Sequence, residues 1–578
     1  MKDYKGVLTM LKAIGASFGI AIGRALVIRE EVVEIKESKI QDSELEIARF
    51  NNALKEAMIQ LEKINKDVKE KLGSAKAEIF EAHLFMLQDP ELIGSVKKKI
   101  IEEKFNAEYS LKTVVEETAA IFEVMGNEYM AERAADIRDV SKRVLNILMG
   151  LEVTSIAEIQ EQCILIAKDL TPSDTAQLDK SKVLAFVTEI GGKTSHTSII
   201  ARSLELPAVV GVGSAICEVK NGDLVIVDGE EGLIIINPDE KALKDYEIRR
   251  REFFEFKNQL FKYVSMESTT LDGKTIELAA NIGSVEDLES VLKNGAEAIG
   301  LFRTEFLYMS KTDFPTEEEQ FEAYKSVLEK MSGKPVIIRT LDIGGDKELN
   351  YLPMSKEMNP FLGYRAIRIC LDRTDIFITQ LRALIRASLY GKLKIMFPMI
   401  SNLQELKMAK KILEQCKYDL KSEGVLFDEN LEVGIMIEIP SAALISDILA
   451  KEVNFFSIGT NDLIQYSIAV DRMNEKISYL YDYYHPGVLR LIKMVIDNGH
   501  KAGITVGMCG EMAGDTKLIP VLLGFGLDEL SMSASSILRA RKTVTSANYE
   551  ECKKLSESVL KFGDSDEIRG FIEANAKE

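Results

Sequence analysis

A histidine in a glycine-led turn is the residue of this chain best suited to chemistry. The stretch 191–200 reads Gly-Gly-Lys-Thr-Ser-His-Thr-Ser-Ile-Ile and places His196 among hydroxyl side chains. Hydroxyls and the free N–H groups of a first helical turn can hold an anion. Neutral imidazole, well populated near its usual pKa of about 6.5, is a good nucleophile. The turn therefore predicts a phosphoryl acceptor, and a histidine that only caps or packs a helix is the alternative.

A second group of candidate binding and catalytic residues is spread over the C-terminal half. Its members are mainly arginines and carboxylates, with a lysine, an amide and a thiol: Arg303, Arg339, the run 342–347, Arg365, Glu438, Asn461, Asp462, Arg472, Cys509 and Glu511. Arginine forks bind phosphate and carboxylate groups through paired hydrogen bonds, and Mg2+ takes hard oxygen ligands. The set predicts a site for a small, highly charged anion with a bridging divalent cation. For any one of these residues alone, a structural salt bridge is the alternative.

The cysteines indicate one further candidate. They are Cys163, Cys217, Cys370, Cys416, Cys509 and Cys552, and no pair has Cys-x-x-Cys spacing. This spacing favours neither a disulfide framework nor a zinc site. A thiol beside cations can be tuned for proton transfer, which makes Cys509 a candidate acid. A small buried apolar residue is the alternative for it.

The histidine needs a strand and a helix to position it. Residues 183–187 predict a buried strand before the turn, and 197–203 predict a helix after it. Other short apolar runs between 154 and 237 complete a compact α/β unit, which we expect the glycine-punctuated strands of 12–28 to join. The charged, helix-periodic stretch 43–151 has little Gly or Pro and predicts an antiparallel helical bundle inserted in that unit.

The second group of residues needs a different scaffold. Strand-like runs alternate with helical stretches at 276–281, 298–302, 336–340, 393–397, 433–437, 455–458, 505–508 and 529–532. Eight βα units in roughly 300 residues predict a (β/α)8 barrel, whose strand C-termini build the site. The polar residues fall at or just after these strand ends, which favours a shared site. Before them, 240–262 predicts one exposed helix about 30 Å long that can act as a lever.

Several long motifs carry a resemblance to a known family. They are Gly-Gly-x-Thr-Ser-His-Thr-Ser-Ile-x-Ala-Arg-Ser-Leu-Glu-Leu-Pro from 191, Gly-Leu-Phe-Arg-Thr-Glu-Phe-Leu from 300, Ile-Arg-Thr-Leu-Asp-Ile-Gly-Gly-Asp-Lys from 338, Asn-Pro-Phe-Leu-Gly-Tyr-Arg from 359, Met-Ile-Glu-Ile-Pro from 436, Ser-Ile-Gly-Thr-Asn-Asp from 457 and Met-Cys-Gly-Glu from 508. Together they resemble the phosphoenolpyruvate-utilising enzymes, and among them enzyme I of the sugar phosphotransferase system. The resemblance covers about residues 14 to 538.

This resemblance implies an activity and a role for each motif residue. The implied reaction passes phosphate from phosphoenolpyruvate to His196 and then to a small carrier similar to HPr, with release of pyruvate. The implied site residues are Arg303, Arg339 and Arg472 for the substrate with help from Asn461 and Asp462, Glu438 and Asp462 for Mg2+, and Cys509 as the acid that protonates the enolpyruvate carbon. Met473 departs from the family, which commonly has glycine there; this changes backbone freedom and leaves Arg472 in place.

Pattern and resemblance together predict an α/β multidomain protein. We expect a phosphohistidine α/β domain in residues 1–28 and 153–238, with an inserted helical domain that binds the carrier in 29–152. A linker helix in 239–262 would lead to a TIM-type barrel in 263–578. The resemblance implies that this barrel binds phosphoenolpyruvate and forms a homodimer.

Composition narrows the class of partner. Of 578 residues, 73 are basic and 92 acidic, which gives a formal net charge of −19. Such a chain repels nucleic acid and anionic membranes and favours a basic protein partner. We find no apolar run long enough to insert into a membrane and no secretory signal, and we expect a cytoplasmic protein.

Two other functions compete with the phosphotransferase. Pyruvate phosphate dikinase and phosphoenolpyruvate synthase share the histidine and the barrel but also need an ATP-binding domain. The sequence contains no Gly-x-x-x-x-Gly-Lys-Ser/Thr loop or comparable glycine-rich nucleotide loop. A silent regulator that only binds phosphoenolpyruvate is the second alternative. The joint presence of His196, Glu438, Asp462 and Cys509 weighs against it.

Overall fold

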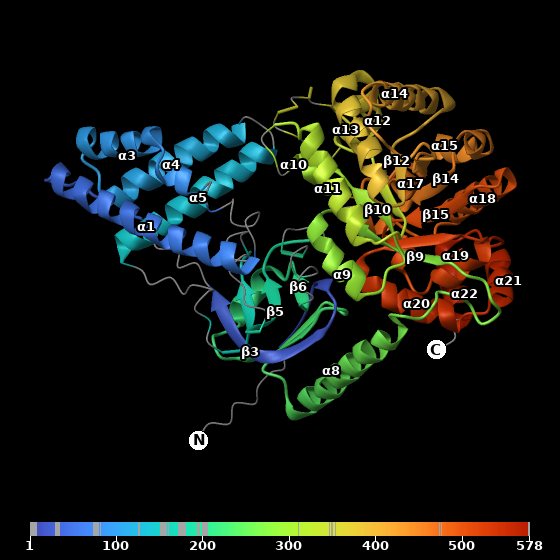
Figure 1. Cartoon of the computed structure of the whole chain (residues 1–578). Coiled ribbons are helices and arrows are strands. Elements are labelled where there is room, and N and C mark those ends of the chain that lie inside the picture. The colour runs from blue at the N-terminus through green and yellow to red at the C-terminus, as the bar shows by residue number, and fades with distance from the viewer. Residues whose placement is uncertain are drawn as a thin grey trace. The chain divides into compact units, whose positions relative to one another are not determined.

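The computed structural model describes two compact units, Met1–Lys257 and Asn258–Glu578 (Figure 1). It describes the whole chain except residues 1–8, 29–34, 73–79, 81–82, 125–127, 151–158, 160, 171–180, 193–196, 199–200, 202–205, 310, 312, 346, 348, 350, 353, 356, 473, 475–476 and 576–578. Within the described residues, no helix combines the length and the apolarity needed to cross a bilayer.

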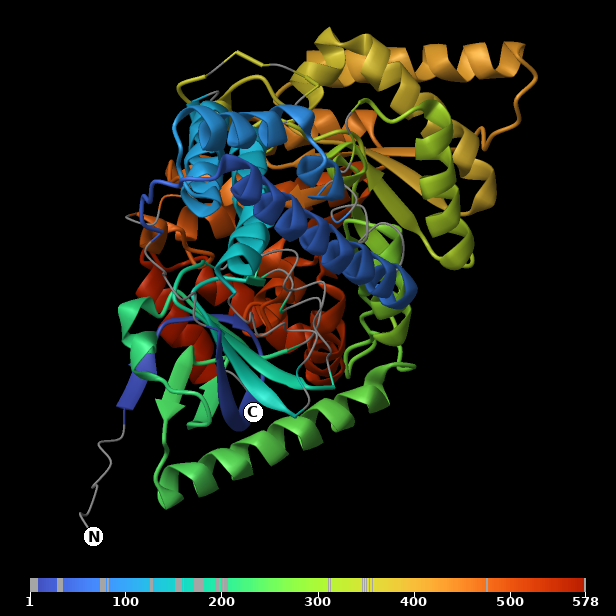
Figure 2. The ribbon, with the colours of Figure 1, turned by 90° about the vertical axis from the view of Figure 1, so that its left-hand side faces the viewer.

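The first unit contains the expected helical bundle (Figures 1 and 2). Its main helices are α1 (Ser43–Leu72), α3 (Pro90–Glu102), α4 (Ala107–Val124) and α5 (Glu128–Met149). Asp89 caps α3, because its carboxylate accepts from the N–H groups of Glu91 and Leu92 while Pro90 needs no partner at the first helical position. One apolar stripe per helix meets in a core that includes Phe50, Leu61 and Val96.

The same unit contains a mixed sheet. Among the described residues its strand order is β1-β8-β7-β3-β4-β5-β6-β2. The bounds are β1 Thr9–Lys12, β2 Ile14–Ser17, β3 Ile20–Ile28, β4 Cys163–Ala167, β5 Val183–Thr188, β6 Ala208–Val210, β7 Leu224–Asp228 and β8 Leu233–Ile236. Strand β3 pairs in parallel with β4, from Arg24 opposite Cys163 to Ile28 opposite Ala167. The helical bundle therefore lies, in sequence, between two neighbouring strands.

The predicted lever is a helix. Helix α8 spans Glu240–Leu260 and a short 3-10 turn, Phe261–Tyr263, follows it. Most of its residues are charged and exposed, as the sequence predicted, although Tyr246 is buried against the β7–β8 side of the sheet with Ile226 and Ile235.

The second unit is a closed parallel barrel, which confirms the predicted fold. The strands follow one another around it from β9 to β16, and β16 pairs with β9. They are β9 Glu277–Ile282, β10 Ala298–Arg303, β11 Val336–Arg339, β12 Leu393–Phe397, β13 Glu432–Ile437, β14 Phe455–Gly459, β15 Thr505–Cys509 and β16 Glu529–Met532. Each lies within about one residue of its predicted run, because strands buried on both faces read as continuous apolar segments.

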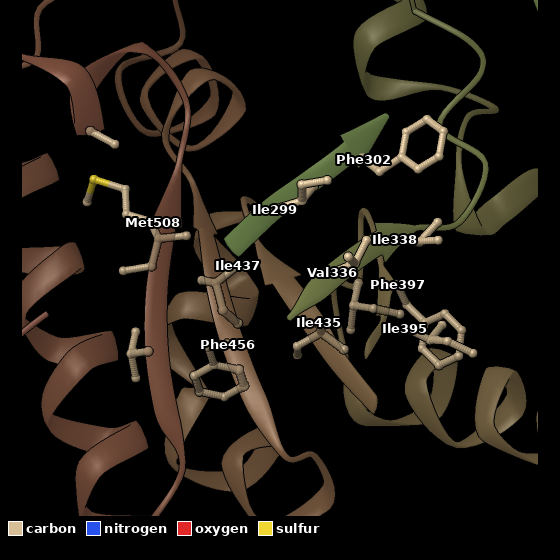
Figure 3. Close-up of a cluster of buried hydrophobic side chains, with 14 of the residues drawn as sticks. Ile299, Phe302, Val336, Ile338, Ile395, Phe397, Ile435, Ile437, Phe456 and Met508 are labelled. Carbon is tan, nitrogen blue, oxygen red and sulfur yellow. The ribbon is translucent and has the colours of Figure 1, made fainter. Parts of the chain in front are cut away.

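Side chains alternate between the two faces of this barrel. One set packs under the surrounding helices (Figure 3): Ile299, Phe302, Val336, Ile338, Ile395, Phe397, Ile435, Ile437, Phe456 and Met508. The intervening positions point inward, where Leu301, Ile337, Met396, Met436, Phe455 and Cys509 form a separate interior cluster. Burying each large apolar side chain is worth about 1.5–3 kcal/mol, so this layer fixes the register that positions the strand ends.

Candidate active site

The predicted acceptor His196 lies outside the described residues, whereas Gly192, Thr197 and Ser198 on either side of it in sequence are described. Thr197 and Ser198 are helical and buried. The Ser198 hydroxyl donates to the Gly192 carbonyl at 2.6 Å, and the Thr197 hydroxyl donates to Asp169 Oδ1 at 3.1 Å. The Thr197 hydroxyl, one of the hydroxyls that the sequence suggested as anion ligands, is thus engaged with Asp169.

The barrel brings the second group of residues to the same end of its strands. Arg303, Arg339 and Cys509 are the last residues of β10, β11 and β15. Glu438 directly follows β13, and Asn461 and Asp462 lie in the first turn of α17 (Thr460–Ile468), directly after β14. Because all strands of a parallel barrel end at one rim, these residues lie at the same rim of the barrel.

A buried ion-pair network occupies part of this rim. Arg339 Nη2 lies 2.7 Å from Glu305 Oε1 and 2.9 Å from Asp342 Oδ2. Arg365 Nη2 lies 2.9 Å from Asp342 Oδ1 and 3.3 Å from Asp462 Oδ2. Burial alone would raise the pKa of Asp342, but Arg339 and Arg365 outweigh burial and hold that pKa far below its usual value. Asp342 is therefore an ionised anchor for two guanidinium groups.

Glu305 is a member of this network that the sequence did not single out. It is fully buried in α10 (Glu305–Met309) and accepts from Arg339 and, at 2.6 Å, from Lys347 Nζ. Its position two residues after Arg303, at a barrel strand end, is the signal that could have identified it.

Backbone geometry helps to bring Arg365 into the network. Gly344 has a φ of +103°, and a Cβ there would lie 2.4 Å from the Cβ of Arg365. Only glycine tolerates both this conformation and this approach. The Gly-Gly pair of the 338–347 motif thus has a steric role.

The two other arginines are more accessible. Arg472 Nη1 lies 3.4 Å from Asp462 Oδ1. Arg303 is exposed, and its guanidinium lies over the Phe306 ring at 5.3 Å from the centroid. The backbone N–H of Glu511 donates a hydrogen bond to Asn461 Oδ1 at 3.4 Å.

Glu438 and Asp462 form a carboxylate pair that suits a cation. Both are buried, and Glu438 Oε1 accepts from the Met399 N–H at 2.6 Å. Burial, followed by the charges of Asp462 and Asp342, raises the pKa of Glu438 to about 8. Asp462 Oδ1 is buried and accepts no hydrogen bond from the described residues. A divalent cation would relieve this repulsion and give a ligand to Asp462 Oδ1, which forms an ion pair with Arg472 but has no hydrogen bond among the described residues. Within the described part of the chain, no cluster of three or more His, Cys, Asp or Glu suits a metal.

Cys509 is a buried, protonated thiol. The Ser457 hydroxyl donates to its Sγ at 3.3 Å. Burial raises the pKa of Cys509 to about 12 and outweighs the opposite effects of Ser457 and Arg339. We expected cations to tune this thiol, whereas burial dominates. The outcome still suits an acid, because the proton is present at neutral pH.

Comparison with known proteins identifies the family of this chain. Three models of phosphoenolpyruvate-utilising enzymes match: the PEP-binding domain over residues 257–549, the N-terminal domain over 12–133 and the mobile domain over 159–232. A phosphoenolpyruvate-protein phosphotransferase of Staphylococcus carnosus is 54% identical over 98% of this chain and 99% of its own length. The one of Bacillus subtilis is 53% identical over 98% of this chain and 100% of its own length.

A solved structure is also similar. A solution structure described as Enzyme I is 46% identical, covers 42% of this chain and 99% of its own length, and has a TM-score of 0.39. The full-length relatives and the barrel match decide the family. The chain belongs to the phosphoenolpyruvate-utilising enzymes, in the family of phosphoenolpyruvate-protein phosphotransferases.

Proposed function

We propose that this protein transfers the phosphoryl group of phosphoenolpyruvate to His196 and then to a small carrier protein similar to HPr, and that it releases pyruvate. The observation that supports this most strongly is a set of buried polar atoms at the barrel rim that lack a hydrogen bond. Arg339 Nε, Arg365 Nε and Asp462 Oδ1 have no hydrogen-bond partner among the described residues. Buried donors and acceptors are normally paired, so their joint presence fits a ligand with many oxygens and a cation.

Substrate binding is the first step of the proposal. Arg303, Arg339 and Arg472 bind the phosphate and carboxylate groups of phosphoenolpyruvate, with help from Asn461 and Asp462. Arg339 is pre-positioned because Glu305 and Asp342 hold one end of its guanidinium and leave Nε free. Pre-positioned charge is the main contribution that a protein makes to phosphoryl transfer.

Metal binding follows from the carboxylate pair. Glu438 and Asp462 would hold Mg2+, which usually takes one or two carboxylates together with substrate phosphate oxygens. When bound, the ion neutralises charge on the phosphoryl group. The protein's part is to keep both carboxylates buried and close, as the raised pKa of Glu438 beside Asp462 indicates.

The thiol completes the reaction. As the phosphoryl group leaves for the imidazole, the enolate of pyruvate remains. The S–H bond of Cys509 breaks, a C–H bond forms at the enolate carbon, and pyruvate is released. A thiol whose pKa burial has raised to about 12 holds its proton at neutral pH until the strongly basic carbon appears.

The wider assembly is also part of the proposal. By family resemblance, residues 1–28 and 153–238 form the phosphohistidine domain, 29–152 bind the carrier, and 263–578 form a barrel that dimerises. A cytoplasmic location, which we expect because the sequence contains no recognisable secretory signal, is also part of the proposal. The net charge of −19 supports a carrier with a basic docking face.

Labelled phosphoenolpyruvate tests the proposal directly. The wild-type protein with Mg2+ should become an acid-labile phosphoprotein, and His196→Ala should bind phosphoenolpyruvate without accepting label. His485→Asn is the matched control, because His485 caps the barrel helix α18 (Pro486–Ala502) and asparagine keeps an N-cap acceptor. Binding without any label transfer in the wild-type protein would instead identify a regulator.

A further inference from the structure

An inward-facing glutamate lies one layer below Cys509 inside the barrel. In the strand register, Ser457 on β14, Gly507 on β15 and Glu529 on β16 are neighbours. The next inward layer of the same strands contains Gly459, Cys509 and Ser531. Cys509 and Glu529 are therefore diagonal neighbours on adjacent strands, at a spacing that a long side chain can reach.

Two glycines make room for the Glu529 carboxyl group. A Cβ added at Gly300 would lie 2.2 Å from Glu529 Oε1 and 2.5 Å from the Ser531 hydroxyl. A Cβ added at Gly507 would lie 3.2 Å from the same Oε1. The carboxyl group thus fills space that two missing side chains leave, and it reaches the level of Ser531, which is also the level of Cys509.

The surroundings of Glu529 favour the protonated form of its carboxyl group. Its Oε1 is buried and has no hydrogen-bond partner among the described residues, while the residue as a whole is half-buried. The charged groups that act on it are Glu277 of β9, Lys394 of β12 and Asp528 at the start of β16. Burial, and then the charge of Glu277, raises the pKa of Glu529 to about 8. These effects favour the protonated form of the carboxyl group.

We propose that Glu529 resupplies the proton that Cys509 loses in each turnover. The inference rests on the proposed function, in which Cys509 gives its proton to the enolate carbon. The resulting thiolate is buried, with 2% of the residue exposed, and the proposed function places the product at the strand ends above it. A supply from inside the barrel reaches the sulfur from the opposite side.

Ser457 provides the connection. Its hydroxyl already donates to Cys509 Sγ at 3.3 Å, and only Gly507 separates it from Glu529 in the same layer. The Ser457 O–H bond breaks as its proton moves to the thiolate, and the Glu529 carboxyl proton replaces it through one bridging water molecule. The Glu529 carboxylate then takes a proton from solvent water, which returns every group to its starting state.

Two isotope measurements on the full-length protein test this route. In D2O, phosphoenolpyruvate and carbon-labelled pyruvate exchange label through the reversible phosphorylation of His196. Between the reverse and the forward step, the Cys509 thiol proton can exchange with solvent deuterium. The thiol then delivers deuterium to the enolate carbon, and the label appears in the pyruvate methyl group. The ratio of deuterium entry to carbon exchange therefore reports proton supply, separately from substrate binding and phosphoryl transfer.

We expect Glu529→Gln, which is isosteric with the protonated carboxyl, to lower this ratio several-fold while carbon exchange continues. Ser457→Ala should lower it in the same way and provides a second test if the first variant folds poorly. Glu432→Gln is the control, because Glu432 lies at the start of β13 and pairs with Lys394 at 2.8 Å. A wild-type ratio in Glu529→Gln, or a loss in Ser457→Ala alone, would overturn the role of Glu529. Absence of carbon exchange in the wild-type protein would instead contradict the proposed function.

Discussion

Arg339 is a buried cation held by two buried carboxylates, and this pairing decides what a substitution there does. Arg339→Met removes a buried cation that Glu305 and Asp342 share, and leaves Lys347 and Arg365 as their remaining partners. Breaking a buried ion pair from one side costs about 3–5 kcal/mol, so urea denaturation should show a loss of that size. Phosphoenolpyruvate binding, measured by calorimetry, should be lost as well.

Arg382 offers the matched control for this substitution. It pairs with Glu317 and Glu423 on the outer helices, where ion pairs are partly solvated. Arg382→Met should therefore cost about 1 kcal/mol or less and leave ligand binding intact. Equal losses of unfolding free energy in the two variants would contradict a buried ion pair at Arg339. Phosphoenolpyruvate binding that survives in Arg339→Met would leave the network with a structural role alone.

The Cys509 thiol separates two half-reactions at the residue scale. Cys509→Ala removes the proposed acid but no group that contacts the phosphate, so rapid-quench labelling of His196 should persist while pyruvate appears slowly. Cys370→Ala is the control, because Cys370 is equally buried yet belongs to the outer core of the barrel. Pyruvate formation at the wild-type rate in Cys509→Ala would return Cys509 to a packing role.

The sequence predicted residues that lie in linear motifs and missed those that depend on strand register. Arg339, Glu438 and Cys509 could be placed because each ends or follows an apolar run. Ser457 and Glu529 could not, because their proximity to Cys509 depends on which strands pair and in which register. The commitment of the Thr197 hydroxyl to Asp169 was equally hidden, since 28 residues separate them.

At the scale of elements, Asp272 joins the start of the barrel unit to one of its last helices. Its carboxylate accepts from the N–H groups of Tyr549 and Glu550, at the N-terminus of α21 (Tyr549–Val559). These bonds, chiefly the one from Tyr549, lower the pKa of Asp272 from 3.8 to about 2. Because the pKa is lower in the folded state, the stabilisation is complete above pH 3.8 and disappears as pH falls through about 2.

Substitution of Asp272 should therefore change both stability and its response to acid. Asp272→Ala should lower the melting temperature of the barrel unit by a few degrees at pH 7, since two helix N–H groups lose their acceptor. The difference from wild type should shrink between pH 4 and pH 2 in scanning calorimetry. Asp564→Ala is a control at a different helix start, where Asp564 accepts from Asp566 and Glu567. A pH-independent difference for Asp272→Ala would contradict the pKa assignment.

The sequence predicted the helices and strands better than it predicted single contacts or strand pairings. The barrel strands were predictable because both faces of a parallel strand are buried, which leaves an uninterrupted apolar run such as 393–397. The helical bundle was predictable from its apolar period and scarcity of glycine. The pairing of β3 with β4 across that bundle needed the structure, because no local pattern reports which distant strands are neighbours.

At the scale of the whole molecule, that pairing allows the helical bundle to be removed cleanly. Residues 37–149 lie, in sequence, between β3 and β4, which form a parallel pair within one sheet. A parallel connection must return to the starting edge of the sheet and needs a dozen or more residues. A test variant would therefore replace residues 37–149 with a flexible linker of about 15 residues, so that β3 and β4 can still pair.

The shortened protein should separate the two transfers. It keeps the His196 turn and the barrel, so labelled phosphoenolpyruvate should still phosphorylate it. Transfer to a carrier similar to HPr should be lost, because the proposed docking surface is absent. The same deletion in His196→Ala is the control for label on other residues. Carrier phosphorylation by the shortened protein at the intact rate would place docking elsewhere in the chain.

In the intact protein, transfer to the carrier should slow as salt rises, since screening over a Debye length of about 8 Å weakens the attraction between an acidic chain and a basic carrier.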